Sequence, residues 1–182
     1  GEVVKFNVIA GKDGIGKIAA DMDALLAHDY AKLEQYVRTS LEFKKKFIEE
    51  DEFDKGVRIL LNFAHTFGHA YESVSHYAIP HGSAVALGMI TANAISVERG
   101  YIDVAYAERI ASVCKKILKH VELKTEYFAL DNIIRAIRND KKQTNTDITA
   151  VLIDPSYCLS VYRDVTEDEI GRGIAAMLHS MT

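Results

Sequence analysis

Apolar side chains recur every three to four positions through most of the chain, and this spacing predicts a mainly α protein. The pattern indicates helices over Ala19–Ala27, Asp29–Glu49, Val57–Val74, Ser83–Glu98, Val104–Leu118 and Asp131–Ile137. Thr166 and the three acidic residues after it are typical of a helix start, because Thr caps the first turn and acidic side chains favour its positive end. We therefore expect one further helix near the end of the sequence.

Two short runs depart from the helical spacing. Residues 148–153 and 159–162 are rich in β-branched and aromatic side chains, and Asp154-Pro155-Ser156 between them favours a turn. This predicts a small β-hairpin near residues 148–162. Within Ser83–Glu98, the stretch 84–90 is apolar on every side, which indicates a buried helix at the centre of the core.

The composition fits one globular domain that spans residues 1–182. The chain is 48% hydrophobic and carries a formal net charge of −4. It has no extended basic region that would indicate nucleic-acid binding and no apolar run long enough to cross a membrane. No signal peptide is recognisable, so we expect a cytoplasmic protein. Cys114 and Cys158 lack the spacing of metal ligands, and we expect both to be buried apolar residues.

A glycine-rich stretch near the start has the spacing of a phosphate-binding loop but lacks one essential residue. Residues 11–17 read Gly-Lys-Asp-Gly-Ile-Gly-Lys, yet Ile18 occupies the position where Ser or Thr would hold magnesium. We therefore interpret this stretch as a flexible surface turn. The sequence contains no GxGxxG dinucleotide-binding pattern, so we expect no NAD site within this chain.

Three histidines form the most informative cluster in the sequence. His65 and His69 lie four residues apart on an expected helix, so both project from one face about 6 Å apart. His81 follows at a Pro-His-Gly turn that leads into the next helix. Imidazoles and carboxylates are typical ligands of zinc, and an open fourth position makes such a site catalytic. Each histidine alone could be a structural imidazole, and spacing does not decide which ones bind metal and which transfer protons.

The segments around these histidines resemble a known family, the 3-dehydroquinate synthases. Residues 61–72 (LNFAHTFGHAYE) are similar to its LN-x-GHT-x-GHA-x-E signature, and residues 80–89 (PHGSAVALGM) resemble its HGEAVAIGM segment. Residues 51–58 resemble the DE-x-E-x-G-x-R run of this family. Residues 2–5 are similar to its AEVIK segment and residues 140–142 to its late DKK. The resemblance implies the C-terminal helical domain of the dehydroquinate synthase-like fold.

The resemblance also implies a metal centre with catalytic side chains beside it. Glu2, His65 and His81 take the places of the three zinc ligands, with Co²⁺ as an alternative metal. His69 is then not a ligand, and it would move a proton to or from the substrate. Lys5, one helical turn from Glu2, would contact substrate hydroxyls near the metal. His69 and Lys5 are therefore the expected catalytic residues.

A further set of matching positions would bind the anionic ends of the substrate. Lys44 and Arg58 would hold a carboxylate, and the planar guanidinium of Arg58 suits a two-pronged contact with it. Asn62 and either Lys141 or Lys142 would contact a phosphate. The implied substrate is thus a sugar acid phosphate.

The reaction of this family converts DAHP, a seven-carbon keto sugar acid phosphate, to 3-dehydroquinate and phosphate. It belongs to the shikimate pathway of aromatic amino-acid biosynthesis and uses zinc and NAD⁺. The sequence matches about the C-terminal half of the family pattern, so we expect the N-terminal NAD-binding domain to be absent from this chain and to act as its partner. The resemblance further implies a homodimer in the full enzyme and an isolated half that does not turn over substrate.

Two departures from the family pattern leave alternatives open. Ala64 replaces the glycine before the first histidine, and Ser83 replaces a glutamate after His81-Gly82. A related aminocyclitol-forming cyclase is one alternative. The helical half of a metal-dependent polyol dehydrogenase is another, although a neutral polyol does not require cations such as Lys44 and Arg58. A non-catalytic interaction domain is the third.

Overall fold

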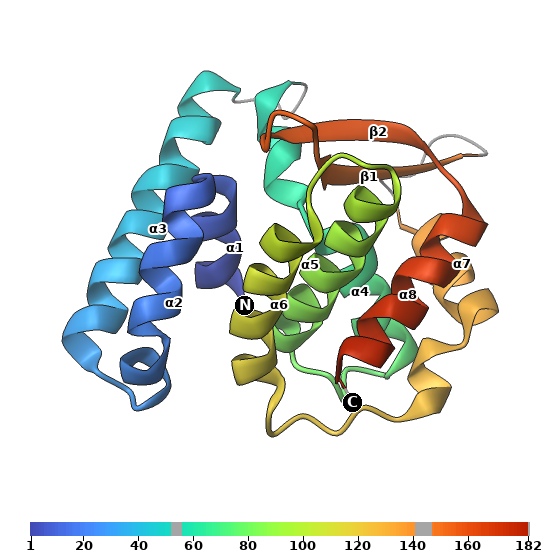
Figure 1. Cartoon of the computed structure of the whole chain (residues 1–182), viewed down its shortest axis with the longest axis horizontal. Helices are drawn as coiled ribbons and strands as arrows, with labels where there is room; N and C mark the ends of the chain where they lie inside the picture. The colour runs from blue at the N-terminus through green and yellow to red at the C-terminus, as the bar shows by residue number, and fades with distance from the viewer. Residues whose placement is uncertain (52–55, 141–146, 182) are drawn as a thin grey trace.

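A computed structural model describes residues 1–51, 56–140 and 147–181 (Figure 1). The α-helices are α1 (Glu2–Ile9), α2 (Lys12–Leu26), α3 (Tyr30–Glu50), α4 (His65–Val74), α5 (His81–Glu98), α6 (Val104–Leu118), α7 (Leu130–Arg138) and α8 (Glu167–Met181). Two 3₁₀ helices and two strands complete the description: η1 (Val57–Asn62), η2 (Thr125–Phe128), β1 (Ile148–Ile153) and β2 (Leu159–Val165). The predicted mainly α fold with a small hairpin is confirmed.

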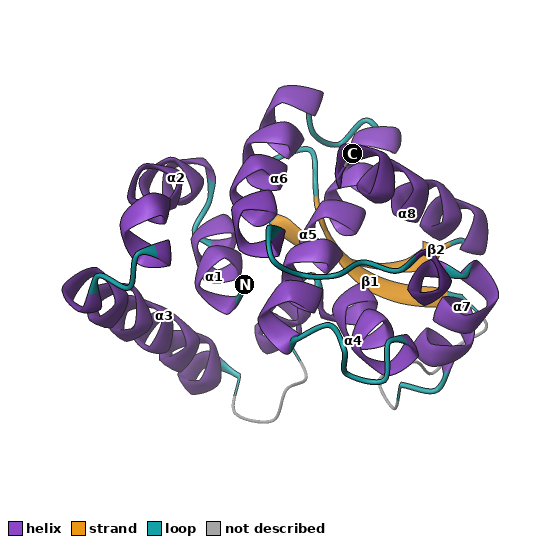
Figure 2. Cartoon of the chain, turned by 90° about the horizontal axis from the view of Figure 1, so that it is seen from below, coloured by secondary structure: helices purple, strands orange, loops and turns teal. Residues whose placement is uncertain are grey.

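Helix α5 lies at the centre of the core. Every residue from Ser83 to Asn93 is buried, as expected for a helix that is apolar on all sides. Helices α4, α6 and α8 pack around it, and Figure 2 shows this arrangement from below. Although α5 is apolar, no helix in the described part of the chain is both long and apolar enough to span a membrane.

Helices α4 and α5 approach each other more closely than side chains would normally allow. A Cβ atom built on Gly88 of α5 would lie 2.2 Å from the carbonyl oxygen of Ala64, at the start of α4. It would also lie 3.0 Å from the backbone nitrogen of Gly68. Since real Cβ contacts do not reach such distances, glycine at position 88 is what permits the two helices to pack backbone against backbone.

The first three helices form a group beside the central helices (Figures 1 and 2). Helix α1 packs on α5, and α2 packs on α6, while α3 lies on the outer side against α1 and α2. Asp29 caps α3 by accepting a hydrogen bond from the backbone N–H of Lys32. This arrangement brings the beginning of the chain next to the beginning of α5.

The glycine-rich stretch at residues 11–17 is helical, so its interpretation as a flexible surface turn is wrong. Gly11 adopts φ 95° and is followed directly by α2, whose first turn includes Gly14. Gly14 is buried, and a Cβ atom there would lie 2.1 Å from the carbonyl oxygen of Asn7 in α1. Gly14 therefore permits close packing of α2 on α1, whereas Gly11 supplies the positive φ that precedes the helix.

The predicted single helix over Val57–Val74 is also wrong, because the backbone breaks before His65. Residues Val57–Asn62 form η1, and Ala64 then adopts the left-handed conformation with φ 69°. Apolar periodicity continues across this break, so the pattern alone does not reveal it. The break makes His65 the first residue of α4.

The remaining predicted helices agree with the structure to within two residues at their ends, except that α2 begins at Lys12 rather than at Ala19. The hairpin is antiparallel, with Ile153 paired to Leu159 and Ile148 to Val165. Asp154 organises its turn by accepting hydrogen bonds from the backbone N–H groups of Ser156 and Cys158. Cys158 is exposed in this turn, against our expectation, whereas Cys114 is buried as predicted.

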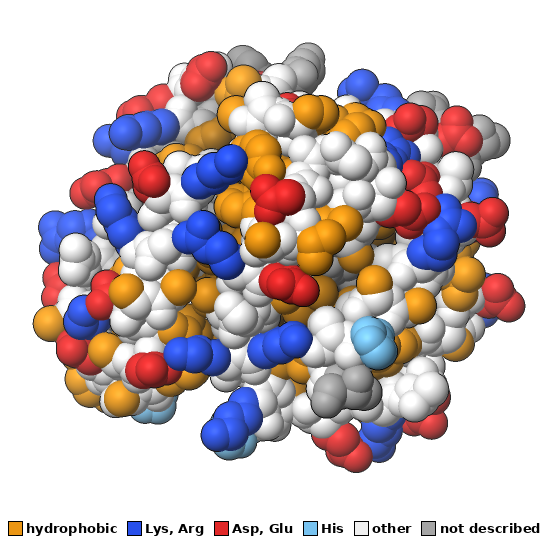
Figure 3. Space-filling view, viewed as in Figure 1, with side chains coloured by type: hydrophobic (Ala, Val, Ile, Leu, Met, Phe, Trp, Pro, Cys, Tyr) orange, Lys and Arg blue, Asp and Glu red, His pale blue; other side chains and the backbone are white. Residues whose placement is uncertain are grey.

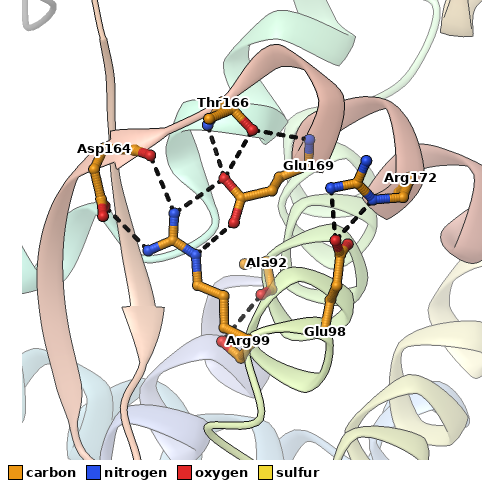
Figure 4. Close-up of polar contacts among 8 residues, drawn as sticks. Ala92, Glu98, Arg99, Asp164, Thr166, Glu169 and Arg172 are labelled. Atoms are coloured by element: carbon orange, nitrogen blue, oxygen red, sulfur yellow. Dashed lines mark hydrogen bonds and ion pairs between the residues drawn. The ribbon is translucent and has the colours of Figure 1, made fainter.

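An ion-pair network joins the end of α5 to the hairpin and α8 (Figure 4). The Arg99 guanidinium donates to both carboxylate oxygens of Glu169, at 2.6 and 3.0 Å, and to the Asp164 side chain at 3.0 Å. The Arg99 and Glu169 side chains are only 12% and 14% exposed, so solvent screens this pair little. Hydrogen bonding from Arg99 lowers the pKa of Glu169 to about 2.

Replacing Glu169 tests the contribution of this network to stability. Because its pKa is about 2 in the fold and 4.5 ordinarily, the carboxylate stabilises the fold above pH 4.5, and this contribution is lost as the pH falls from 4.5 to 2. We expect Glu169→Gln to lower the free energy of unfolding by about 2 kcal/mol at pH 7, the scale of charged hydrogen bonds. The difference from wild type should narrow steadily below pH 4.5.

Urea unfolding at several pH values measures this difference. Glu167→Gln is a matched control two positions away, because Glu167 pairs with Arg138 while 50% exposed and should contribute less than about 1 kcal/mol. A loss in Glu169→Gln that stays constant from pH 7 to pH 3 would contradict the assigned charge pair.

Candidate metal and substrate site

Three residues from distant parts of the sequence meet at the ends of three helices. Glu2, His65 and His81 are the first residues of α1, α4 and α5. One carboxylate oxygen of Glu2, Oε1, lies 3.0 Å from Nε2 of His65 and 3.2 Å from Nε2 of His81. The three side chains form a group whose ligand atoms all lie within 4.8 Å of one another, so they could hold a metal ion.

The hydrogen bonds at Nδ1 of His65 and His81, on the sides of the rings that face away from Glu2, favour metal binding through Nε2. Nδ1 of His65 lies 3.1 Å from the carbonyl oxygen of Phe63, which can only accept, so this nitrogen carries the proton. Nδ1 of His81 lies 3.1 Å from both carboxylate oxygens of Glu72, which likewise accept. In the neutral rings, Nε2 therefore presents its lone pair, and both lone pairs face the carboxylate of Glu2.

Such a convergence of electron pairs suits a cation between them. Two imidazole nitrogens and a carboxylate oxygen are a donor set typical of catalytic zinc, with further positions open to water or substrate. Without a metal, burial favours the neutral acid of Glu2, but a hydrogen bond donated by protonated Nε2 of His65 and the Lys5 ammonium together hold the pKa of Glu2 well below its ordinary value. A metal ion would take the place of that Nε2 proton. The carboxylate is thus ionised and ready to coordinate metal. The residues present therefore fit a divalent zinc or cobalt ion.

Lys5 connects this group to the surrounding structure. Its side chain is only 4% exposed, and Nζ lies 2.9 Å from the second carboxylate oxygen of Glu2. The same nitrogen donates a hydrogen bond of 3.0 Å to the carbonyl oxygen of Leu61, at the end of η1. Lys5 therefore fixes Glu2 and places a positive charge beside the candidate metal position.

A cavity of about 500 Å³ opens directly beside the three-residue group. The described substrate-binding candidates all line it: Lys44 from α3, and Arg58 and Asn62 from η1. Lys5, Glu2, His65 and His81 line it as well. The remaining two candidates, Lys141 and Lys142, lie outside the described residues. The structure thus gathers in one cavity residues that are up to 79 positions apart in sequence.

His69 lies beside this group but does not line the same cavity. Its ring is 5.0 Å from the His65 ring and 6.1 Å from the His81 ring, measured between centroids. Nδ1 of His69 is 3.5 Å from a carboxylate oxygen of Asp140, and both residues line a smaller adjacent depression. The side chain is 41% exposed, so it can meet a ligand that extends past the metal position.

Sequence reasoning gave no role to two carboxylates that the structure places against these rings. Glu72 contacts His81, and Asp140 lies beside His69. A signal for Glu72 exists in the sequence, because positions 65, 69 and 72 share one helical face at spacings of four and three. Asp140 follows the C-terminal end of α7, and no local pattern links it to His69.

Taken together, the fold and the side chains define a helical domain with a candidate metal group beside a cation-lined cavity. The family described as 3-dehydroquinate synthase C-terminal matches residues 1–143, and the chain belongs to this family.

Curated relatives agree with this assignment. A 3-dehydroquinate synthase of Lactococcus lactis subsp. cremoris (strain MG1363) is 34% identical over 174 residues, which cover 93% of this chain and 47% of the relative. That of Thermoanaerobacter sp. (strain X514) is 37% identical over 154 residues, or 83% of this chain and 42% of the relative. The chain therefore spans about half the length of the curated relatives it matches.

A solved structure shares the fold. ValA (2-epi-5-epi-valiolone synthase) from Streptomyces hygroscopicus subsp. jinggangensis 5008, with NAD⁺ and Zn²⁺ bound, superimposes with a TM-score of 0.79. The two sequences are 18% identical, and the match covers 97% of this chain and 50% of that chain. At this identity the likeness establishes the fold of the domain.

The left-handed backbone of Ala64 leads to a test at the start of α4. With φ 69°, Ala64 pays a steric cost that glycine does not, about 1–2 kcal/mol for an L residue. Replacing Ala64 with glycine would remove this strain. Part of the resulting stabilisation is offset, because glycine makes the unfolded chain more flexible. We expect Ala64→Gly to raise the free energy of unfolding by about 0.5–1 kcal/mol in urea denaturation. Ala70→Gly, the same change inside α4, should lower it by a similar amount. Destabilisation by both variants would show that the backbone at position 64 is not strained.

Proposed function

We propose that this chain is the metal- and substrate-binding half of a 3-dehydroquinate synthase, which converts DAHP to 3-dehydroquinate and phosphate with zinc and NAD⁺. One observation carries the proposal: the candidate metal group and the cationic residues Lys44 and Arg58 line a single cavity. Membership of the family supports it. On this proposal residues 1–182 act as one domain, and a separate N-terminal domain supplies the NAD site.

Glu2, His65 and His81 would hold the metal. Zinc bound there supplies Lewis acidity, which polarises substrate oxygens and holds them in place. Lys5 fixes one oxygen of Glu2, so the other oxygen remains directed at the two imidazoles. Since Lys5 lies against both Glu2 and the cavity, its ammonium also suits contact with substrate hydroxyls near the metal.

The anionic ends of the substrate would be held away from the metal. Arg58 on η1 suits a planar carboxylate, and Lys44 on α3 lines the same cavity. Asn62, together with Lys141 or Lys142, would contact the phosphate. A cavity of about 500 Å³ lies within the range of small-molecule sites, and binding at two ends places the carbons between them.

His69 would transfer the proton. It lies on the same helical face as His65 but one turn further, and its Nδ1 is 3.5 Å from the carboxylate of Asp140. A carboxylate on one ring nitrogen favours a proton there and leaves the other nitrogen basic. His69 thus suits exchange of a proton with a hydroxyl of a bound substrate.

The cavity also has a rim suited to a covering domain. Val37 and Leu41 of α3 line it and are 47% and 62% exposed. An N-terminal NAD-binding half would bury this apolar surface and enclose the substrate. A homodimer of such completed enzymes is part of the same proposal.

Single histidine variants test the division between ligands and proton carrier. We expect His65→Ala and His81→Ala to lower zinc affinity by more than about 100-fold, because each removes a ligand rather than a supporting contact. His69→Ala should retain one zinc ion per chain. Metal content after dialysis, measured by elemental analysis, gives the result. His120→Ala is the control, since His120 is exposed in the turn that follows α6. Equal metal loss in all three site variants would contradict the division of roles.

Completion of the enzyme tests the reaction itself. Combining this chain with the N-terminal half of a 3-dehydroquinate synthase, zinc and NAD⁺ should release phosphate from DAHP, as measured by a phosphate assay. The His69→Ala chain should bind zinc yet release phosphate at least about 100-fold more slowly, the usual scale of general acid–base catalysis. A sugar phosphate that lacks the carboxylate serves as the comparison substrate. Preference for that substrate over DAHP would favour a related cyclase and contradict the proposed activity.

A further inference from the structure

Glu72 contacts the candidate metal centre without belonging to its ligand group. It lies on α4, seven residues after His65, whereas His81 begins α5. Its side chain is 13% exposed, and both carboxylate oxygens lie 3.1 Å from Nδ1 of His81. The His81 side chain, by contrast, is 47% exposed, so its ring is held less by packing than by its contacts with Glu72 and Glu2.

The position of the proton on His81 decides whether this ring can bind metal. The ring lies between two carboxylates, with Glu2 at Nε2 and Glu72 at Nδ1. A metal ion can take Nε2 only when the remaining proton is on Nδ1, and there the proton needs an acceptor. Glu72 supplies that acceptor from a different helix. A carboxylate behind a metal-binding imidazole also makes its ligand nitrogen more basic.

We propose that Glu72 is a positioning residue of the metal centre, which holds the Nδ1 proton and the ring orientation of His81 so that Nε2 faces Glu2 and His65. This inference rests on the proposed metal site. His65 needs no such side chain, because the backbone carbonyl of Phe63 accepts its Nδ1 proton. The two imidazoles are thus oriented by different means, one by the backbone and one by a replaceable side chain.

The same carboxylate has one competing use. His69, Glu72 and His81 form a second group whose possible ligand atoms lie within 4.8 Å of one another. A cation in this group would bind Nδ1 of His81 and would require that nitrogen to lose its proton while Nε2 serves the first group. The hydrogen-bonding distances to Nδ1 favour the positioning role. Binding of a second ion per chain is the outcome that would assign Glu72 as a metal ligand rather than a positioning residue.

Zinc binding to the purified chain tests the proposal without any need for turnover. Titration against a chromophoric zinc chelator gives both affinity and stoichiometry. We expect one zinc ion per chain in the wild type, and the same stoichiometry with about 10- to 100-fold weaker binding in Glu72→Gln, which keeps the size but not the charge. Glu108→Gln on the exposed face of α6 is the control and should bind zinc as the wild type does.

Two further measurements separate positioning from a general effect on the fold. Thermal unfolding of the metal-free chains should give similar midpoints for Glu72→Gln and wild type. The visible absorption bands of the cobalt-loaded protein should change in Glu72→Gln and stay unchanged in Glu108→Gln, because they report the ligand geometry. Unchanged zinc affinity and cobalt bands in Glu72→Gln would overturn the positioning role. The positioning role would also be overturned if the wild type bound two zinc ions and Glu72→Gln bound one, because Glu72 would then be a ligand in a second metal site. Absence of zinc binding in the wild type would instead refute the proposed metal site.

Discussion

The close contact of α4 with α5 is the constraint on which the site depends. At Gly88 the backbones meet so closely that an added Cβ would lie 2.2 Å from the Ala64 carbonyl oxygen. This contact involves the first turn of α4, so the first residue of α4 is fixed relative to α5. His65 and His81 consequently have their ring centroids 5.5 Å apart. Because protein interiors are close-packed, a change at this crossing would displace the imidazoles directly.

The electrostatics of the cavity follow from the same arrangement of helices. Glu2 is the only acidic residue among the described residues that line it, whereas Lys5, Lys44 and Arg58 are cationic. Three helices also begin there, and the amino ends of helices favour negative charge. The surface elsewhere mixes both signs, as Figure 3 shows for one face, and the chain as a whole carries a net charge of −4. The excess of cationic side chains in this cavity therefore suits an anionic ligand.

Periodicity in the sequence predicted much of the fold, because helices that bury one face leave a regular apolar pattern. It did not predict the break at Ala64 or the early start of α2. In both cases the apolar pattern continues, and the deciding factor is a backbone conformation or a close approach between helices. Gly14 shows this well: its spacing resembles a phosphate-binding loop, but its neighbour in space is Asn7 of α1. Contacts of this kind depend on the tertiary structure.

The candidate site was predicted less fully than the fold, and partly by different signals in the sequence. Spacing alone placed His65 and His69 on one face, and the structure confirms that placement. The spacing also put His81 in the same cluster, but only the resemblance to a family added Glu2 and paired His65 with His81 as ligands, because the position of Glu2 depends on how α1 packs on α5. Which histidines bind metal remains a prediction. The orientation of each ring could not be predicted at all, since it depends on the hydrogen bond that Nδ1, the nitrogen facing away from Glu2, donates to the Phe63 carbonyl in His65 and to the Glu72 carboxylate in His81.

The proposed chemistry therefore divides between this chain, which would hold the metal and the substrate, and a partner domain, which would hold NAD⁺. The candidate metal group is complete within this chain, and each of its three members begins a helix that packs on the core. The cavity beside it is lined from α1, α3, η1 and the starts of α4 and α5, while Val37 and Leu41 remain exposed at its edge. A candidate metal group beside an open cavity is consistent with the proposed half of a two-domain enzyme. On the proposed function, this domain would hold the metal and the anionic ends of the substrate, and a partner domain would bring the oxidant to the bound substrate.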